Sequence, residues 1–231
     1  MLKALIFDVD GTLAETEELH RHAFNDAFAQ AGLGWNWTQS QYHPLLKTTG
    51  GKERIARYLA EQGGEMDAAQ IAALHAAKTA RYVALMAQGQ IALRPGVADL
   101  IVQAQANGIR LAIATTTSLP NVEALSLAVF GKPAAQVFEV IAGGDMVAAK
   151  KPAPDVYLLA LRMLGLHPEQ AVALEDSRNG LHAAKAAGLA CCLCPGVYTQ
   201  GEDFDRADLI LSDFTELDGL ATLKTLVKGT V

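Results

Sequence analysis

The sequence predicts an α/β protein in which a helical segment is inserted directly after the first strand of a parallel sheet. Along most of the chain, short apolar runs alternate with stretches whose apolar residues recur at helical spacing. One long interval shows helical spacing alone. The length of 231 residues also exceeds the roughly 100 to 150 residues of a typical domain, which leaves room for an insertion.

The strands of the predicted sheet are short apolar runs. They are continuous rather than alternating, which is typical of strands buried on both faces of a parallel sheet. The predicted strands span residues 3–7, 109–115, 137–142, 171–175, 189–194 and 207–211.

Helical patterns lie between these runs, at residues 97–106, 155–164 and 180–187. Gly108, Gly165 and Gly188 follow them, as expected at the C-terminus of a helix. The order strand, helix, strand predicts an open sheet with right-handed crossovers.

The inserted segment spans residues 14–89 and contains no strand-like run. Leu19, Ala23 and Ala27 recur at helical spacing, and the pattern continues toward residue 85. The Arg-Pro-Gly sequence at 94–96 suits a turn or hinge where the chain returns to the sheet. We therefore expect two domains, a core of residues 1–13 and 90–231 and a helical domain of residues 14–89.

The composition limits the class of protein. With 51% hydrophobic and 19% charged residues, the chain can bury a sizeable core, which excludes disorder. No apolar run approaches the roughly 20 residues of a membrane span, and the apolar start reaches Asp8 too early for a signal peptide. We expect a cytoplasmic protein with no membrane partner. The net charge of −6 argues against a nucleic-acid partner.

The three cysteines, Cys191, Cys192 and Cys194, share one apolar run. No second Cys or His pair stands nearby at a metal-ligand spacing. We therefore expect buried thiols on a strand, not a disulfide or a zinc site.

Polar side chains stand at the ends of four predicted strands. They are two aspartates after the first strand, a threonine, a lysine and an acidic pair: Asp8, Asp10, Thr115, Lys151, Glu175 and Asp176. Because ligands of open α/β sheets bind at the carboxyl ends of the strands, we expect these side chains to converge there. Carboxylates with a hydroxyl and an ammonium group suit Mg²⁺ and phosphate chemistry.

Each of these residues also has a purely structural interpretation. Asp10 with Gly11 is a common turn, and a lysine before a proline is usually solvated. Asp176 and Ser177 form a plausible helix N-cap, which is compatible with metal binding. Their joint occurrence, in order and at successive strand ends, favours the functional interpretation.

The chain resembles the haloacid dehalogenase-like phosphatases over its whole length. Four motifs carry the resemblance: Asp-Val-Asp-Gly-Thr at 8–12, Ala-Thr-Thr-Thr at 114–117, Lys-Pro-Ala-Pro-Asp at 151–155, and Glu-Asp-Ser at 175–177 with Gly180. The second aspartate favours phosphoryl transfer, because the dehalogenases of that superfamily lack it. The resemblance implies a Rossmann-like core with a small helical cap that selects the substrate.

The resemblance also implies roles for the core residues. Asp8 would be the nucleophile and form an aspartyl-phosphate, while Asp10 would serve as general acid and base. Thr115, the backbone of Thr116 and Thr117, and Lys151 would bind the transferring phosphoryl group. The cofactor would be Mg²⁺, held by Asp8, the Asp10 carbonyl and Asp176, with Glu175 as an alternative or water-mediated ligand.

A cationic group stands out in the inserted segment. Residues 43–60 hold Lys47, Lys52, Arg54 and Arg57 against the single acid Glu53. The preceding turn, Thr49-Gly50-Gly51, feeds a helix N-terminus that offers backbone N–H groups to an anion. We expect this group, through Lys52 and Arg54, to bind a second phosphate, whereas for Arg57 a solvated helix face is the better interpretation.

Glu17, His20 and Phe24 share one face of the first predicted helix of the segment. Around them the sequence resembles the CbbY and β-phosphoglucomutase-like family, which implies that His20 lies near the bridging oxygen of the substrate. It also implies that Glu17 and Tyr42 bind sugar hydroxyls, and that Arg54 with its loop binds the distal phosphate. Lys78 and Arg81 are further candidates for substrate contact.

This resemblance implies a Mg²⁺-dependent phosphatase for a phosphorylated sugar, xylulose 1,5-bisphosphate, a Rubisco inhibitor, with xylulose 5-phosphate and phosphate as products. Three alternatives remain: a β-phosphoglucomutase-type mutase, a phosphoglycolate phosphatase, and a binding or regulatory module without catalysis. We expect a monomer.

Overall fold

The computed structural model describes residues 1–89 and 91–227. In this part of the chain, six parallel strands form one sheet in the order β3-β2-β1-β4-β5-β6. The strands are Ala4–Phe7 (β1), Arg110–Ala114 (β2), Val140–Ala142 (β3), Ala171–Glu175 (β4), Ala190–Leu193 (β5) and Leu209–Ile210 (β6).

The helices fall into an inserted group after β1 and a group that alternates with the strands. The inserted helices are Glu17–Gln30 (α1), Gln39–Leu45 (α2), Gly51–Glu61 (α3) and Ala68–Met86 (α4). The others are Val97–Ala106 (α5), Leu119–Phe130 (α6), Asp155–Leu164 (α7), Arg178–Ala186 (α8) and Ala221–Leu226 (α9). No helix in the described residues has the length and apolarity that a bilayer span requires.

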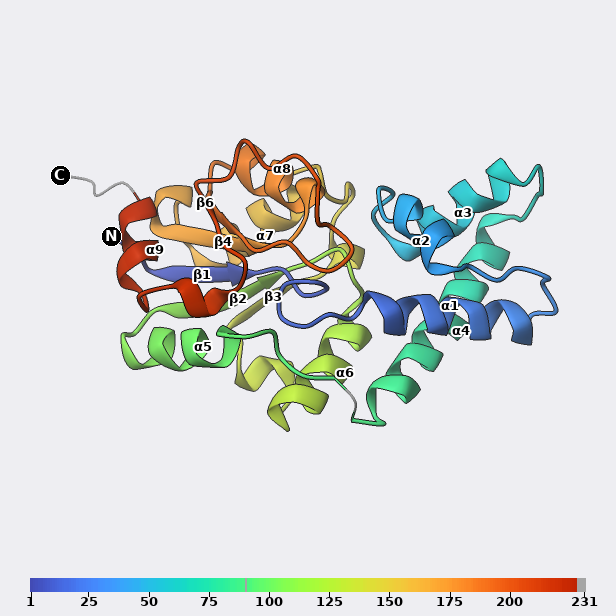
Figure 1. Cartoon of the computed structure of the whole chain (residues 1–231), viewed down its shortest axis with the longest axis horizontal. Helices are drawn as coiled ribbons and strands as arrows, with labels where there is room; N and C mark the ends of the chain where they lie inside the picture. The colour runs from blue at the N-terminus through green and yellow to red at the C-terminus, as the bar shows by residue number, and fades with distance from the viewer. Residues whose placement is uncertain (90, 228–231) are drawn as a thin grey trace.

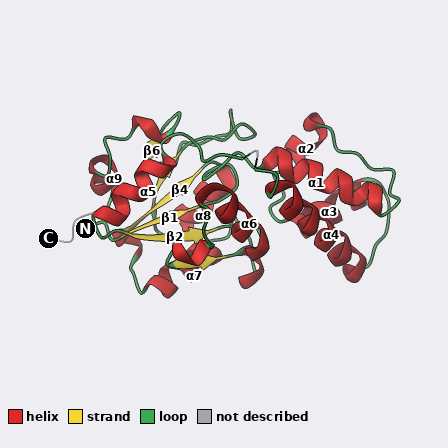
Figure 2. Ribbon diagram, turned by 90° about the horizontal axis from the view of Figure 1, so that it is seen from below, coloured by secondary structure: helices red, strands yellow, loops and turns green. Residues whose placement is uncertain are grey.

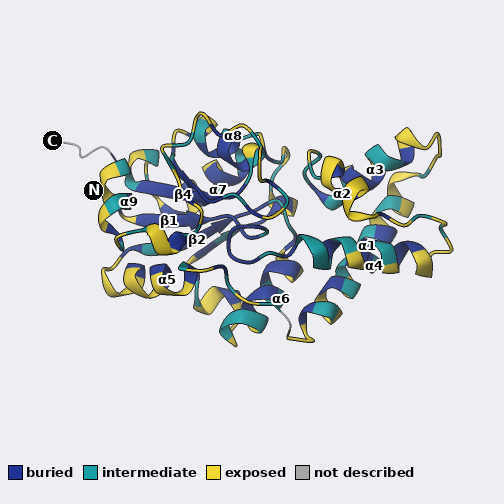
Figure 3. Ribbon diagram, viewed as in Figure 1, coloured by how far each residue is buried: buried dark blue, intermediate teal, exposed yellow. Residues whose placement is uncertain are grey.

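The sheet lies between two layers of helices (Figure 2). Leu5 and Phe7 of β1 pack into one apolar cluster with residues of α5, α6 and α9. The alternate residues Ala4 and Ile6 pack into a second cluster with residues of α7 and α8. Both faces of the strands are therefore buried, as Figure 3 shows, and this explains their continuous apolar sequence.

The six predicted strands are confirmed, with shorter ends. The run at 137–142 loses its first residues because the Val137 N–H group closes a 3-10 turn on the Ala134 carbonyl. Pairing therefore begins with Val140 opposite Ala112. The run at 207–211 shrinks to the two residues of β6, at the edge of the sheet.

The predicted helices between the strands are confirmed at 97–106 and 155–164. The third begins at Arg178, two residues earlier than expected, because Ser177 caps it: its hydroxyl accepts a bond from the Gly180 N–H group at 3.2 Å. Gly108, Gly165 and Gly188 have positive φ angles, which favour glycine after a helix.

The inserted helices pack on one another beyond the carboxyl ends of the strands (Figure 1). They enclose an apolar cluster of their own, built around Phe24, Phe28, Trp37, Tyr42 and Ile55. The expected domain boundary between residues 89 and 90 involves residue 90, which lies outside the described residues. The division into two domains stays a prediction.

The cysteines occupy the positions expected from the sequence. Cys191 and Cys192 lie on β5 and Cys194 follows it, and all three are buried free thiols. Cys191 packs into one apolar cluster of the sheet and the other two into the opposite one. The thiols therefore belong to the core.

Candidate active site

Adjacent parallel strands bring the predicted site residues to one edge of the sheet. Asp8 follows β1, and its N–H group donates to the carbonyl of Leu174 on β4 at 2.9 Å. Thr115 follows β2, and Glu175 ends β4. Because Phe7 is in register with both Ile113 and Leu174, the ends of these strands lie side by side.

Lys151 reaches the same point from the loop after β3. Its ammonium group is 2.6 Å from Asp8 Oδ1 and 2.6 Å from Glu175 Oε1, and it donates to the Ala114 carbonyl at 2.8 Å. Burial disfavours the charged ammonium, but Asp8 and Glu175 outweigh it and raise the pKa of Lys151 above its ordinary value. Lys151 is therefore a fixed cation beside Asp8.

An acidic group surrounds this lysine. Asp8, Glu175 and Asp176 each offer a carboxylate oxygen within 4.8 Å of the others, and all three residues are buried. Burial, with the neighbouring carboxylates, raises the pKa of Asp8 to about 8, against the opposing effect of Lys151. Burial, Asp8 and Glu175 raise the pKa of Asp176 as well. Such crowding of carboxylates is relieved by a cation.

The donor set of this group fits Mg²⁺. Its ligand atoms are carboxylate oxygens, which hard divalent cations prefer. Glu175 is fully buried, and its Oε2 atom has no hydrogen-bond partner in the described residues. Asp176 packs so closely on Gly11 that a Cβ atom there would lie 2.2 Å from Asp176 Oδ2. The residues after β1 and β4 therefore form a tight, oxygen-lined place for a metal.

The Asp10 carboxylate has a different environment. Its Oδ1 atom accepts bonds from the Thr16 hydroxyl at 2.5 Å and from His20 Nε2 at 3.0 Å. Burial works against ionisation, but His20, Thr16 and Lys78 hold the pKa of Asp10 below its ordinary value. The side chain of Asp10 thus contacts the first inserted helix, α1, through His20 and the N-cap residue Thr16.

His20 is fixed from both sides. Lys78 Nζ, on α4, lies 2.6 Å from His20 Nδ1, and the His20 ring stacks on Tyr82 at 4.1 Å between centroids. With Nδ1 accepting from Lys78, Nε2 carries the proton that it donates to Asp10. Burial lowers the pKa of Lys78 to about 7.

Arg54, on α3, is held by aromatic and polar partners. Its Nη1 atom donates to the Tyr42 hydroxyl at 2.8 Å, and that hydroxyl donates to Glu17 Oε2 at 2.8 Å. The guanidinium carbon lies 5.1 Å from the centroid of Tyr42 and 5.9 Å from that of Phe24. Arg54 is only 9% exposed, and its Nε atom has no partner in the described residues. A buried arginine with an unused donor is available to an anion.

A cavity between the sheet edge and the inserted helices brings most of the predicted site residues together. Its wall includes Asp8, Asp10, Glu17, His20, Thr49, Gly50, Gly51, Arg54, Lys78, Thr115, Thr116, Thr117, Lys151 and Asp176. Glu175 is not part of this wall. It is fully buried and accepts a hydrogen bond from Lys151. The sequence motifs therefore converge on one cavity.

Lys52 and Tyr42 depart from the expectation of direct substrate contact, because neither belongs to this wall. Lys52 is in the first turn of α3, where its side chain is 44% exposed and pairs with Asp145 of the core at 3.4 Å. Tyr42 lies behind Glu17 and Arg54. Arg81, a further candidate, pairs with Asp26 on the surface at 2.5 Å. Arg57 pairs with Glu61, but it also donates to the Pro44 carbonyl and the Thr48 hydroxyl, so it is more than a solvated helix face.

Sequence reasoning missed several residues of the site. Ser118 and Asn121, at the start of α6, line the cavity, and their Oγ and Oδ1 atoms are buried without a partner in the described residues. Tyr157, on α7, donates to Glu175. For Asn121 no motif marks the position. Tyr157 stands close after the Lys151 motif, which was the one available signal.

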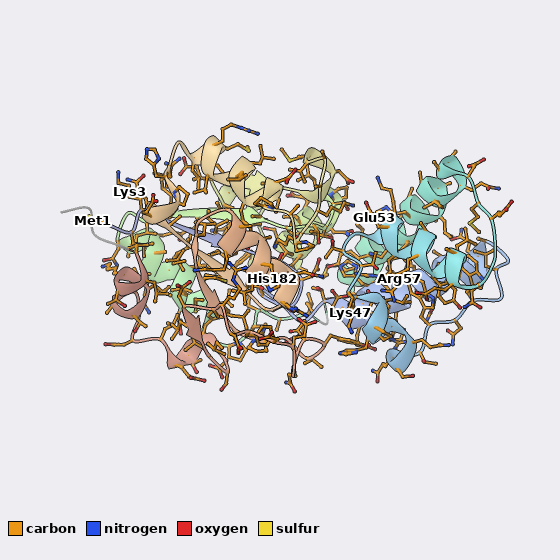
Figure 4. All side chains as sticks on the ribbon, turned by 90° about the horizontal axis from the view of Figure 1, so that it is seen from above. Met1, Lys3, Lys47, Glu53, Arg57 and His182 are labelled. Atoms are coloured by element: carbon orange, nitrogen blue, oxygen red, sulfur yellow. The ribbon has the colours of Figure 1, made fainter. Side chains whose placement is uncertain are left out.

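The inserted helices are closed onto the core. The Thr49 hydroxyl donates to the Lys151 carbonyl, and Lys150 pairs with Glu53 at 3.0 Å. The Asn179 amide donates to the Lys47 carbonyl at 3.2 Å. Figure 4 shows Lys47 on the side of the inserted helices that faces the sheet, and Met1 and Lys3 at the far end of the core. The cavity is therefore covered by the helices that carry Arg54 and His20.

The fold and the site define a class of enzyme, the α/β phosphatases. A carboxylate follows the central strand, with a buried lysine beside it and an acidic pair at the end of the next strand. The family model of the haloacid dehalogenase-like hydrolases matches residues 2–188. The chain belongs to this family, as its four motifs predicted.

Known proteins and solved structures match this chain over nearly its full length. The protein CbbY of Cereibacter sphaeroides is 64% identical over 223 residues, which cover 96% of this chain and 97% of that protein. The crystal structure of CbbY from Rhodobacter sphaeroides in complex with phosphate has a TM-score of 0.94 at 63% identity, covering 97% of this chain and all of that one. The D10N mutant of the same protein, in complex with xylulose-(1,5)bisphosphate, also gives 0.94 at 63% identity, with 96% and 99% covered.

Proposed function

We propose that this chain is a Mg²⁺-dependent sugar-bisphosphate phosphatase that hydrolyses xylulose 1,5-bisphosphate to xylulose 5-phosphate and phosphate. The similarity to a protein crystallised with this bisphosphate supports the choice of substrate. The similarity of fold and the covering helices support a closed, water-poor reaction site.

One observation carries the proposal: the same cavity holds Asp8 with Lys151 at one place and the buried Arg54 at another. A phosphatase for a single phosphate needs only the first group of charges. A substrate with a phosphate at each end accounts for both. Ser118 Oγ and Asn121 Oδ1, which lack partners among the described residues, offer further polar contacts inside the cavity.

Asp8 would act as the nucleophile. Its carboxylate oxygen attacks the phosphorus of the C1 phosphate, so an O–P bond to Asp8 forms as the bond between phosphorus and the C1 oxygen breaks. Water then attacks the aspartyl-phosphate, and the O–P bond to Asp8 breaks. Lys151 and Thr115 stabilise the negative charge on the phosphoryl oxygens during both steps.

Asp10 would move the protons. It would give a proton to the departing C1 oxygen and regain one from the attacking water, so that each turnover restores the protonated carboxyl group for the next. His20 and Thr16, both bonded to Asp10 Oδ1, set the position of its carboxyl group. Lys78 keeps His20 in the tautomer that donates to Asp10.

Asp8, the Asp10 carbonyl and Asp176 would hold Mg²⁺, with Glu175 as an alternative or water-mediated ligand. When bound, the ion supplies positive charge that offsets the repulsion between the carboxylates and the phosphate. The crowded buried carboxylates and the free Glu175 Oε2 atom support this assignment.

The direct test is a comparison of kcat/KM on four substrates with Mg²⁺ present. These are xylulose 1,5-bisphosphate, ribulose 1,5-bisphosphate, 2-phosphoglycolate and β-glucose 1-phosphate. We expect the highest value for xylulose 1,5-bisphosphate. If the wild-type protein released no phosphate from any phosphosugar, the proposal would fail.

Arg54 separates this function from that of a phosphoglycolate phosphatase. Arg54→Ala should raise KM for the bisphosphate at least tenfold, because a charge-assisted contact to the distal phosphate is lost. Arg57→Ala, which removes a cation of the same helix that does not line the cavity, is the matched control and should leave KM unchanged. Equal KM values for the two variants would favour a substrate with one phosphate.

The mutase alternative uses the same residues but protects the aspartyl-phosphate from water. A mutase would isomerise a hexose 1-phosphate with little free phosphate, whereas we expect steady release of one phosphate per turnover.

The alternative of a binding or regulatory module without catalysis is tested with Asp8→Asn, which should abolish phosphate release and retain substrate binding. If cells that carry only the Asp8→Asn variant behaved like cells with the wild-type protein, the alternative of a module without catalysis would be favoured.

A further inference from the structure

Tyr157 links the two charged groups behind the cavity. It lies near the start of α7 and is fully buried. Its hydroxyl donates to Glu175 Oε1 at 2.5 Å, and the ammonium group of Lys151 lies 5.0 Å from its ring centroid. Tyr157 therefore contacts the acidic residue at the end of β4 and the lysine that holds Asp8.

These contacts leave the Glu175 carboxylate little choice of orientation. Its Oε1 atom accepts from both Tyr157 and Lys151, whereas Oε2 has no partner in the described residues. The carboxylate also packs on Gly180, where a Cβ atom would lie 1.9 Å from Oε2 and 2.2 Å from Oε1. Oε1 thus has two protein donors, and Oε2 is the oxygen that accepts no hydrogen bond from the described residues.

We propose that Tyr157 is a positioning residue that fixes Glu175 for the divalent cation held with Asp8 and Asp176. The inference rests on the proposed metal site and goes beyond it by assigning the residue that orients one of its carboxylates. Without the Tyr157 hydroxyl, Lys151 is the remaining donor to Oε1, and Lys151 also serves Asp8. The carboxylate then gains freedom to turn, and binding the ion must restrain it again.

Tyr157→Phe tests this idea because it keeps the ring under Lys151 and removes only the donor. Binding of Mg²⁺, added as MgCl₂ without substrate, is measured by titration calorimetry and by the rise in melting temperature. We expect the affinity to fall about tenfold, the lower end of the range for partners of metal ligands. At saturating Mg²⁺, KM for the bisphosphate should stay within about twofold of wild type, because Tyr157 does not line the cavity.

Tyr58→Phe is the matched control, since Tyr58 packs on Trp35 and Trp37 in the inserted helices, away from the acidic group. It should leave Mg²⁺ affinity unchanged. A purely structural role of Tyr157 would lower the melting temperature in EDTA without weakening Mg²⁺ binding, and that result would overturn the proposal. If Tyr157→Phe does not fold, Tyr157→Met, which also lacks the donor, is measured in its place.

A double-mutant cycle shows whether Tyr157 acts through Glu175. In the Glu175→Gln background, Tyr157→Phe should weaken Mg²⁺ binding by less than about twofold. A full further tenfold loss would contradict the positioning role. These binding measurements need no substrate, so a failure of the proposed sugar-bisphosphate activity would leave their outcome standing, and the reverse also holds.

Discussion

At the scale of single residues, burial sets the chemistry of Lys78. Its ammonium group is enclosed by His20, Phe24 and Tyr82, and it is only 3% exposed. Burial lowers its pKa to about 7 from the ordinary 10.5, although Asp10 acts in the opposite direction. The charge of this lysine, which lies 2.6 Å from His20 Nδ1, therefore changes near neutral pH.

This pKa makes the contribution of Lys78 to stability depend on pH. Between pH 7 and 10.5 the unfolded chain keeps a proton that the folded chain has lost, so the free energy of unfolding rises with pH over this range. Below pH 7 the folded protein must bury the ammonium ion. Lys78→Met should therefore raise the melting temperature at pH 6, by about 5 °C, and much less at pH 10.

Calorimetry at the two pH values measures the difference. Lys3→Met, at an exposed position, is the control and should show no such change with pH. A shift of equal size for Lys78→Met at pH 6 and pH 10 would show that lost packing, not the charge, controls the effect.

At the scale of elements, β4 and α8 meet too closely for any residue but glycine at position 180. Gly180 is in the first turn of α8, and a Cβ atom there would lie 2.0 Å from the carboxyl carbon of Glu175. The Glu175 carboxylate is also held in place, because Lys151 and Tyr157 both donate hydrogen bonds to its Oε1 atom. The motif at 175–180 is therefore also a packing requirement.

Gly180→Ala should displace the Glu175 carboxylate and lower activity at least tenfold. The overpacked core should also lose about 1 to 3 kcal/mol of unfolding free energy. Steady-state assays and urea unfolding measure both effects. Gly34→Ala, where a Cβ atom meets no atom within 4 Å, should change neither. Activity within twofold of wild type in Gly180→Ala would show that Glu175 is free to move.

At the scale of the whole molecule, Ala23 of α1 and Tyr82 and Met86 of α4 join an apolar cluster of the sheet, and the inserted helices also enclose a second cluster. Trp37 is fully buried in the second of these, against Phe24, Phe28, Tyr42 and Tyr58. The residues proposed to contact the substrate from this side, such as His20 and Arg54, are carried by the inserted helices. The packing of this second cluster therefore affects the positions of His20 and Arg54.

Trp37→Ala should destabilise the inserted helices by about 3 to 5 kcal/mol. Hydrogen exchange should quicken most in α2, α3 and the N-terminal half of α4, while amides of β1 and β4 stay protected, because β1 and β4 contribute no residue to the cluster of Trp37. Ile6→Ala, in the sheet, should instead quicken exchange throughout the core. Uniform acceleration in Trp37→Ala would show that the molecule unfolds as one unit.

The sequence by itself determined the order of the elements and the place of the catalytic motifs. Apolar runs without alternation predict buried parallel strands, and the register of such strands brings Asp8, Thr115 and Glu175 to one edge. These predictions depend on local periodicity and on strand ends, which are properties of neighbouring residues. The family followed from the same motifs.

Only the tertiary structure decided which side chains meet across elements. Lys52 and Arg54 are two residues apart and equally basic, yet one pairs with Asp145 at the surface and the other is buried beneath Tyr42 and Phe24. Tyr157 and Glu175 are separated by 18 positions and joined by one hydrogen bond. Such pairings depend on the angles at which helices pack. Two residues that are two positions apart on a helix also lie on different faces of it. The sequence therefore predicted that the site residues lie at one edge of the sheet. Tertiary packing determined which other side chains contact and orient them.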